Sequence, residues 1–131
     1  MILVDTSVLI DALRRPDPWR EKVFVEFRAA ICGIVRAEVL AGARTAGDAQ
    51  RLDEALASFP YVPFDESLWA MVGSNIALLR RAGVTAPFQD VAIATLAIAQ
   101  DIELWTRDGH FPQLQTVLGR LRLLPEPTAF P

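Results

Sequence analysis

The sequence has few of the residues that form disulfides and zinc sites. Its 131 residues include one cysteine, Cys32, and one histidine, His110. A single cysteine cannot form a disulfide within the chain, and a zinc site of clustered cysteine and histidine is excluded. Long apolar runs are also absent. The longest, residues 91–99, contains Thr95 and is less than half of the roughly 20 residues that a membrane helix needs.

Positive charge is scarce as well. Twelve arginines and Lys22 stand against sixteen acidic residues, for a formal net charge of −3. Nucleic-acid-binding domains usually have a basic surface, so this balance argues against one unless metal ions supply the charge or basic residues gather locally. No basic leader of a secretory signal precedes the first acid. We expect a cytoplasmic protein with one domain over residues 1–124 and a loosely ordered tail over residues 125–131.

Short apolar runs alternate with segments of helical periodicity. The runs predict strands that are buried on both faces, and the periodic segments predict helices. Such alternation is typical of an α/β protein in which helices cover both faces of a parallel sheet. The predicted strands are residues 1–4, 29–33, 61–62, 103–105 and 121–124, and the predicted helices are residues 8–13, 19–27, 34–43, 47–58, 65–81 and 87–100.

Two acidic residues follow predicted strands. Asp5 ends the first strand, and Asp108 comes shortly after the strand that contains Trp105. Ligands bind to parallel α/β sheets beyond the carboxyl ends of the strands, so both acids are candidate site residues. Each also has an ordinary alternative role: Asp5 as a helix cap and Asp108 as a turn aspartate beside Gly109.

Two further acids lie on predicted helices with apolar faces. Glu38 shares a helical stripe with Ile34, Val35 and Gly42, so its carboxylate needs a partner or a cation. The alternative is a surface ion pair with Arg36 or Arg44. Asp90 opens a helix that is apolar nearly all round, where the helix dipole favours negative charge. Capping of that helix is the alternative role of Asp90.

Four carboxylates in one pocket require a counter-charge. At about 5 Å, each pair repels by roughly 3 kcal/mol at an effective dielectric of 20. Without a cation, some of these groups would take up protons at neutral pH. Mg²⁺ or Mn²⁺ prefers hard oxygen ligands and would relieve the repulsion. The sequence therefore predicts a divalent metal site at Asp5, Glu38, Asp90 and Asp108.

With these positions in place, the chain resembles the PIN-domain nucleases, and in particular the VapC toxins of toxin–antitoxin pairs. Four motifs occur in that family's order and at compatible spacings, over nearly the whole chain. Gly33 stands where the family often has a small hydroxyl residue, and His110 stands at a position that is frequently acidic or polar. The motifs are residues 1–11 with Asp5, residues 35–42 with Glu38, residues 88–94 with Asp90, and residues 104–111 with Asp108.

The resemblance implies a three-layer α/β/α fold with a central, mostly parallel, five-stranded sheet. It also implies metal-dependent hydrolysis of RNA phosphodiester bonds, with Mg²⁺ or Mn²⁺ held by the four acids. Thr6 and Thr106 would orient these ligands or a metal-bound water. The expected partners are an RNA substrate, a VapB-type antitoxin that covers the active cleft, and a second copy in a homodimer.

Other residues have ordinary roles in this interpretation. We expect Trp69 and Trp105 in the core, Cys32 as a buried strand residue without a nucleophilic role, and His110 on the surface. The candidates for phosphate contacts are Arg14, Arg36, Arg44 and Arg107, each with solvent exposure as the alternative.

Three other functions compete with a nuclease. A phosphotransfer receiver domain has a similar size and sheet but needs a late lysine, whereas Lys22 is early. A haloacid-dehalogenase-like phosphatase begins with Asp-x-Asp, whereas this chain has Ser7 two residues after Asp5. A catalytically inactive PIN scaffold that binds RNA or protein is the third alternative, and the presence of all four acids argues against it.

Overall fold

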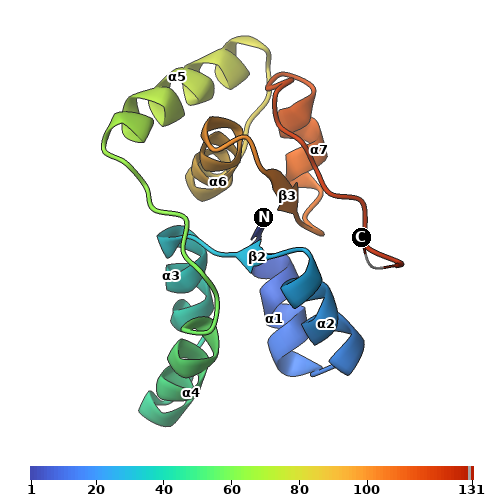
Figure 1. Ribbon diagram of the computed structural model, residues 1–131. Helices are drawn as coiled ribbons and strands as arrows, with labels where there is room; N and C mark the ends of the chain where they lie inside the picture. The colour runs from blue at the N-terminus through green and yellow to red at the C-terminus, as the bar shows by residue number, and fades with distance from the viewer. Residues whose placement is uncertain (130) are drawn as a thin grey trace.

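A computed structural model describes residues 1–129 and 131 and shows a three-layer α/β/α arrangement (Figure 1). The central sheet is parallel and has the strand order β2-β1-β3. In Figure 1, α1 to α4 lie on one side of this sheet and α5 to α7 on the other. The elements are β1 (Ile2–Val4), α1 (Thr6–Arg14), α2 (Pro18–Glu26), β2 (Ala29–Ala30), α3 (Gly33–Ala41), α4 (Ala46–Leu56), α5 (Ser67–Arg81), α6 (Phe88–Ala99), β3 (Glu103–Trp105) and α7 (His110–Gln115).

The predicted α/β fold is confirmed, but the sheet has three strands where five were predicted. Each of the other two segments joins an edge through one bridge, Tyr61 to Ile31 and Leu123 to Leu104. Prolines explain why these segments are so short. Residues 60, 63 and 125 are prolines, and proline has no N–H to extend a strand ladder.

The sequence predicted the first six helices to within a few residues and missed α7. α7 has only six residues, and a proline lies in its first turn, so it shows too few turns for a periodicity to appear. α6 is the central helix, as its apolar sequence predicted. Its residues from Asp90 to Ala97 are all buried, and it packs against α5, α7 and β3.

The chain order places a switch point between β1 and β3. After β1 the chain builds outward through β2, and it returns to the other side of β1 to form β3. The loops that follow β1 and β3 therefore lead in opposite directions at the carboxyl edge of the sheet, which is where parallel α/β sheets bind ligands. Within residues 1–129 and 131, no helix is long and apolar enough to cross a membrane.

Candidate metal centre

Asp5 lies at the switch point and is tied to both adjoining loops. Its Oδ2 accepts hydrogen bonds from Thr106 Oγ1 at 2.7 Å and from Ser7 Oγ at 2.9 Å. Asp5 is 4% exposed and precedes α1, but its side chain makes no capping hydrogen bond to that helix. The capping role is therefore excluded. The two hydroxyls fix the orientation of a buried carboxylate between the ends of β1 and β3.

Glu38 reaches the same region from α3, which packs against α1. Its Oε1 accepts a hydrogen bond from Thr6 Oγ1 at 3.0 Å. The alternative surface pairing with Arg36 is wrong, because Arg36 instead forms an ion pair with Asp53, with 2.8 Å between Nη2 and Oδ1. A half-buried glutamate thus has a neutral hydroxyl as its partner, and its charge is left uncompensated by any arginine among the described residues.

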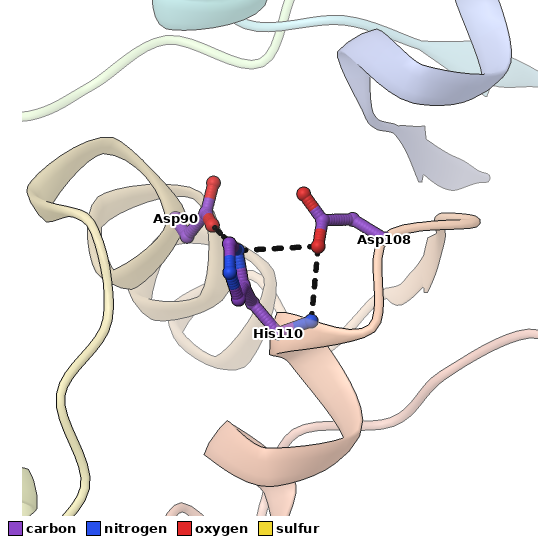
Figure 2. A group of neighbouring side chains, drawn as sticks. All are labelled: Asp90, Asp108 and His110. Carbon is purple, nitrogen blue, oxygen red and sulfur yellow. Dashed lines mark hydrogen bonds and ion pairs between the residues drawn. The ribbon is translucent and has the colours of Figure 1, made fainter.

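Asp90, Asp108 and His110 form a compact cluster between α6 and the start of α7 (Figure 2). His110 Nδ1 lies 2.9 Å from Asp90 Oδ2 and 3.2 Å from Asp108 Oδ1. Asp108 Oδ1 also accepts the backbone N–H of His110 at 2.9 Å, while the backbone N–H of Asp108 binds Thr106 Oγ1 at 3.0 Å. One ligand atom from each of the three residues lies within 4.8 Å of the others.

The four acids are close enough for their charges to influence one another. Burial raises the pKa of Glu38 above its ordinary value, and the negative charges of Asp5, Asp90 and Asp108 raise it further. Burial likewise raises the pKa of Asp90, as do Asp108 and Asp5, while the hydrogen bond from His110 opposes the rise. Raised pKa values mean that the ionised carboxylates are unfavourable here, because negative charge is in excess. A divalent cation would neutralise this excess.

The donor set fits Mg²⁺ or Mn²⁺. Carboxylate oxygens dominate, three hydroxyls hold the carboxylates in place, and one imidazole is within reach of two of them. Hard oxygen ligands suit Mg²⁺ and Mn²⁺, and no thiolate takes part. All six residues proposed from the sequence lie in this region, although their roles stay predictions: Asp5, Thr6, Glu38, Asp90, Thr106 and Asp108.

Two residues of this region were not predicted to take part in the site. Ser7 donates to Asp5 and accepts the backbone N–H of Arg107 at 3.0 Å, so it joins the two loops. His110 is on the surface, as predicted, with its side chain 47% exposed, but its contacts with Asp90 and Asp108 were not predicted. Its spacing of two residues from Asp108 was a signal, because a short turn there brings the ring back over the acid.

Four other expectations are tested by the structure. Trp105 is in the core, as predicted, and Cys32 is buried with a pKa raised by that burial, so its thiol stays protonated. Trp69 is not in the core: it is 40% exposed and stacks between two phenylalanines. Arg107 is paired with Asp11 and Glu126.

Arg107 and Arg36 are thus occupied in ion pairs within the protein, which weakens the case for their contacting RNA phosphates. Arg14 and Arg44 are exposed, and no ion pair holds them among the described residues. Glu126, in the segment predicted as a loose tail, accepts hydrogen bonds from Trp105 Nε1 at 3.0 Å and from Arg107 Nε at 3.3 Å. This segment is therefore anchored at Glu126.

A protein-family comparison decides the family. The PIN domain model matches residues 2–116 of the chain. The chain belongs to the PIN domain family. This PIN domain places acids at the carboxyl edge of its sheet in the order of the four sequence motifs, so the resemblance noted from the sequence is confirmed for family and fold.

Solved structures support the same fold. The PIN domain is similar to VapBC2 from Rickettsia felis bound to a promoter DNA fragment, with 23% identity, a TM-score of 0.79, and coverage of 95% of this chain and 98% of that one. It is also similar to FitAcB from Neisseria gonorrhoeae, with 25% identity, a TM-score of 0.71, and coverage of 95% and 97%. DNA-bound VapBC from Salmonella typhimurium has 19% identity, a TM-score of 0.78, and coverage of 95% and 98%. No curated protein sequence matches the chain.

Proposed function

We propose that this PIN domain is a metal-dependent endoribonuclease of the VapC type, the toxin of a toxin–antitoxin pair. The observation that carries the proposal is the convergence of four carboxylates at the switch point of the sheet, where burial and the neighbouring acids raise the pKa values of Glu38 and Asp90. Such an arrangement is costly for the fold and is suited to holding a divalent cation. The similarity to VapBC structures supports the toxin assignment.

In this mechanism Asp5, Glu38, Asp90 and Asp108 would hold Mg²⁺ or Mn²⁺, which would supply positive charge at the phosphate and a more acidic water for hydrolysis. Thr6 holds Glu38 through its hydroxyl, and Ser7 and Thr106 hold Asp5, so the carboxylates are oriented before substrate binds. The net charge of −3 becomes compatible with RNA binding once the acids at the site are neutralised.

The direct test is cleavage of a pool of transfer and ribosomal RNA with Mg²⁺, Mn²⁺ or EDTA. We expect cleavage only with a divalent ion, and a loss of about 100-fold or more in Asp5→Asn and Asp90→Asn, which keep the side-chain shape but remove charge. Asp101→Asn is the matched control, because Asp101 is exposed and its positive φ of 52° suits asparagine.

Cleavage that survives EDTA or both site variants would refute the proposal. Binding of RNA without any cleavage would instead favour the inactive PIN scaffold.

For the antitoxin, the chain offers an apolar groove of about 660 Å³ between α1, α2 and the end of α4. Its lining includes Leu13, Phe24, Val25 and Phe59, and Val25 is 75% exposed. We propose that an apolar helix of a VapB-type antitoxin fills this groove, since similar structures were solved as complexes of the two proteins.

Val25→Asp tests the antitoxin groove without touching the acids. We expect the variant to cleave RNA like the wild type but to resist inhibition by the purified antitoxin by about 10-fold or more, because a carboxylate cannot be buried there unpaired. Val25→Ile, which keeps the side chain apolar, is the control. Equal inhibition of all three proteins would show that the antitoxin binds elsewhere.

Sedimentation of the purified toxin would test the predicted homodimer.

A further inference from the structure

Three aromatic rings form a partly exposed stack beside the start of α6. Phe64, in the loop before α5, lies 4.8 Å from Trp69 between ring centroids, with 14° between the planes. Trp69, on α5, lies 6.4 Å from Phe88, with 8° between the planes. Trp69 is 40% exposed and Phe88 is 56% exposed. We refer to Phe64, Trp69 and Phe88 as the aromatic stack.

The stack is unusual because its large apolar rings are partly exposed to solvent, whereas neighbouring positions on the same helices are buried. Leu68 and Val72 of α5 are buried, and so are the residues of α6 from Asp90 to Ala97. Near-parallel, partly exposed rings hold each other in place, so they lose little conformational entropy when a further flat group binds. The arrangement thus suits a planar ligand better than an apolar side chain.

The stack is continuous with the metal centre through α6. Phe88 and Asp90 both lie in the first turn of this helix, and side chains two positions apart on a helix point to different sides. The aromatic stack therefore flanks the acids and does not line their pocket. A group held on the stack would be a neighbour of the group that faces the acids, as successive nucleotides in a single strand are.

We propose that the aromatic stack binds an unpaired nucleobase of the RNA, one or two nucleotides away from the phosphate at the metal centre. This inference depends on the proposed function. Base–aromatic stacking tolerates any base, contributes affinity without positive charge, and is common in proteins that bind single-stranded RNA. It would also compensate for the scarcity of basic side chains, since two of the four candidate arginines are held in ion pairs.

The test measures binding of a short, unstructured, fluorescein-labelled RNA by anisotropy, in the Asp5→Asn background so that the RNA stays intact. We expect Trp69→Leu and Phe88→Leu each to weaken binding by about 5- to 100-fold, the range for loss of one stacked base, while Trp69→Phe retains most of the affinity. Met71→Ala is the matched control, because Met71 is 42% exposed on the same helix but has no ring.

A second probe separates bases from phosphates. This probe is a series of RNAs with the same backbone, each of which lacks the base at one position. We expect that, for one RNA of the series, the wild type binds as weakly as Trp69→Leu does. Unchanged RNA affinity in both leucine variants would overturn the proposal. The proposal would also be overturned if Met71→Ala lost RNA affinity to the same extent and a dimer dissociated. That result would assign this face to a second copy of the chain. Because cleavage by the wild type is measured separately, a failure of the proposed nuclease activity is distinguishable from a failure of the stacking site.

Discussion

At the scale of single residues, the hydroxyl of Thr6 should determine how well Glu38 holds a metal ion. Thr6→Val keeps the shape of the side chain but removes the 3.0 Å hydrogen bond to Glu38. Losing a group that orients a ligand typically costs about 10- to 100-fold in metal affinity. We therefore expect the Mg²⁺ concentration for half-maximal cleavage to rise by a factor in this range, and Thr6→Ser to restore most of the affinity.

Metal titration of the cleavage rate is the measurement for Thr6. Thr85→Val serves as a control, because Thr85 lies on the exposed loop before α6. An unchanged metal requirement in Thr6→Val would mean that Glu38 is oriented by other contacts or is not a ligand.

The four acids could be predicted from the sequence because each is placed by a local signal, whereas Ser7, His110 and Trp69 could not. One strand ends just before Asp5 and another ends shortly before Asp108. Each acid therefore lies at the carboxyl edge of the sheet, whichever strands are its neighbours. The role of His110 depends on α7 and on the approach of α6, which are tertiary features. Trp69 follows the buried Leu68, and its exposure depends on where Phe64 and Phe88 come to rest.

At the scale of elements, the segment after the last bridge is held by one carboxylate. Glu126 binds Arg107 and Trp105, and Arg107 precedes Asp108 in the loop that follows β3. Arg107 lowers the pKa of Glu126 below its ordinary value of 4.5. This interaction therefore contributes stability above that value and loses it as the pH falls through the lowered pKa.

Glu126→Gln should lower the free energy of unfolding by less than about 1 kcal/mol at neutral pH, because the ion pair is partly exposed. The difference from the wild type should shrink in acid, once Glu126 is protonated in both the folded and the unfolded wild-type chain. Urea unfolding followed by tryptophan emission measures it. A difference that persists at the lowest pH would show that the loss comes from packing and not from charge.

Elements with several turns or a clear apolar run were predictable, and elements of one turn or one bridge were not. α6 was evident from its sequence because it is apolar nearly all round. The bridges at Tyr61 and Leu123 were predicted as strands because apolar residues occur there, but their extent depends on how much of the sheet edge each segment can reach between its prolines. Sequence patterns show that a segment is buried and do not show how many hydrogen bonds it makes.

At the scale of the whole molecule, the crowded acids should make the metal-free fold sensitive to pH. Glu38 and Asp90 have raised pKa values in the folded chain, so the folded state binds more protons than the unfolded state between the ordinary and the raised values. Stability therefore falls as the pH rises through this window. A bound divalent ion reverses the effect, because it stabilises the ionised carboxylates of the folded chain only.

The increase in Tm on adding Mg²⁺ should thus be larger at about pH 7 than at about pH 5, where protons compete with the metal. Thermal unfolding in EDTA and in Mg²⁺ at both pH values measures it, with Asp101→Asn as a control that should behave like the wild type. In EDTA, Glu38→Gln should be more stable than the wild type at neutral pH, since it removes one charge from the cluster while an amide can still accept the hydrogen bond from Thr6. A metal-free chain whose stability rises from pH 5 to pH 7, with no gain in Glu38→Gln, would mean that the four carboxylates do not repel one another enough to need a cation.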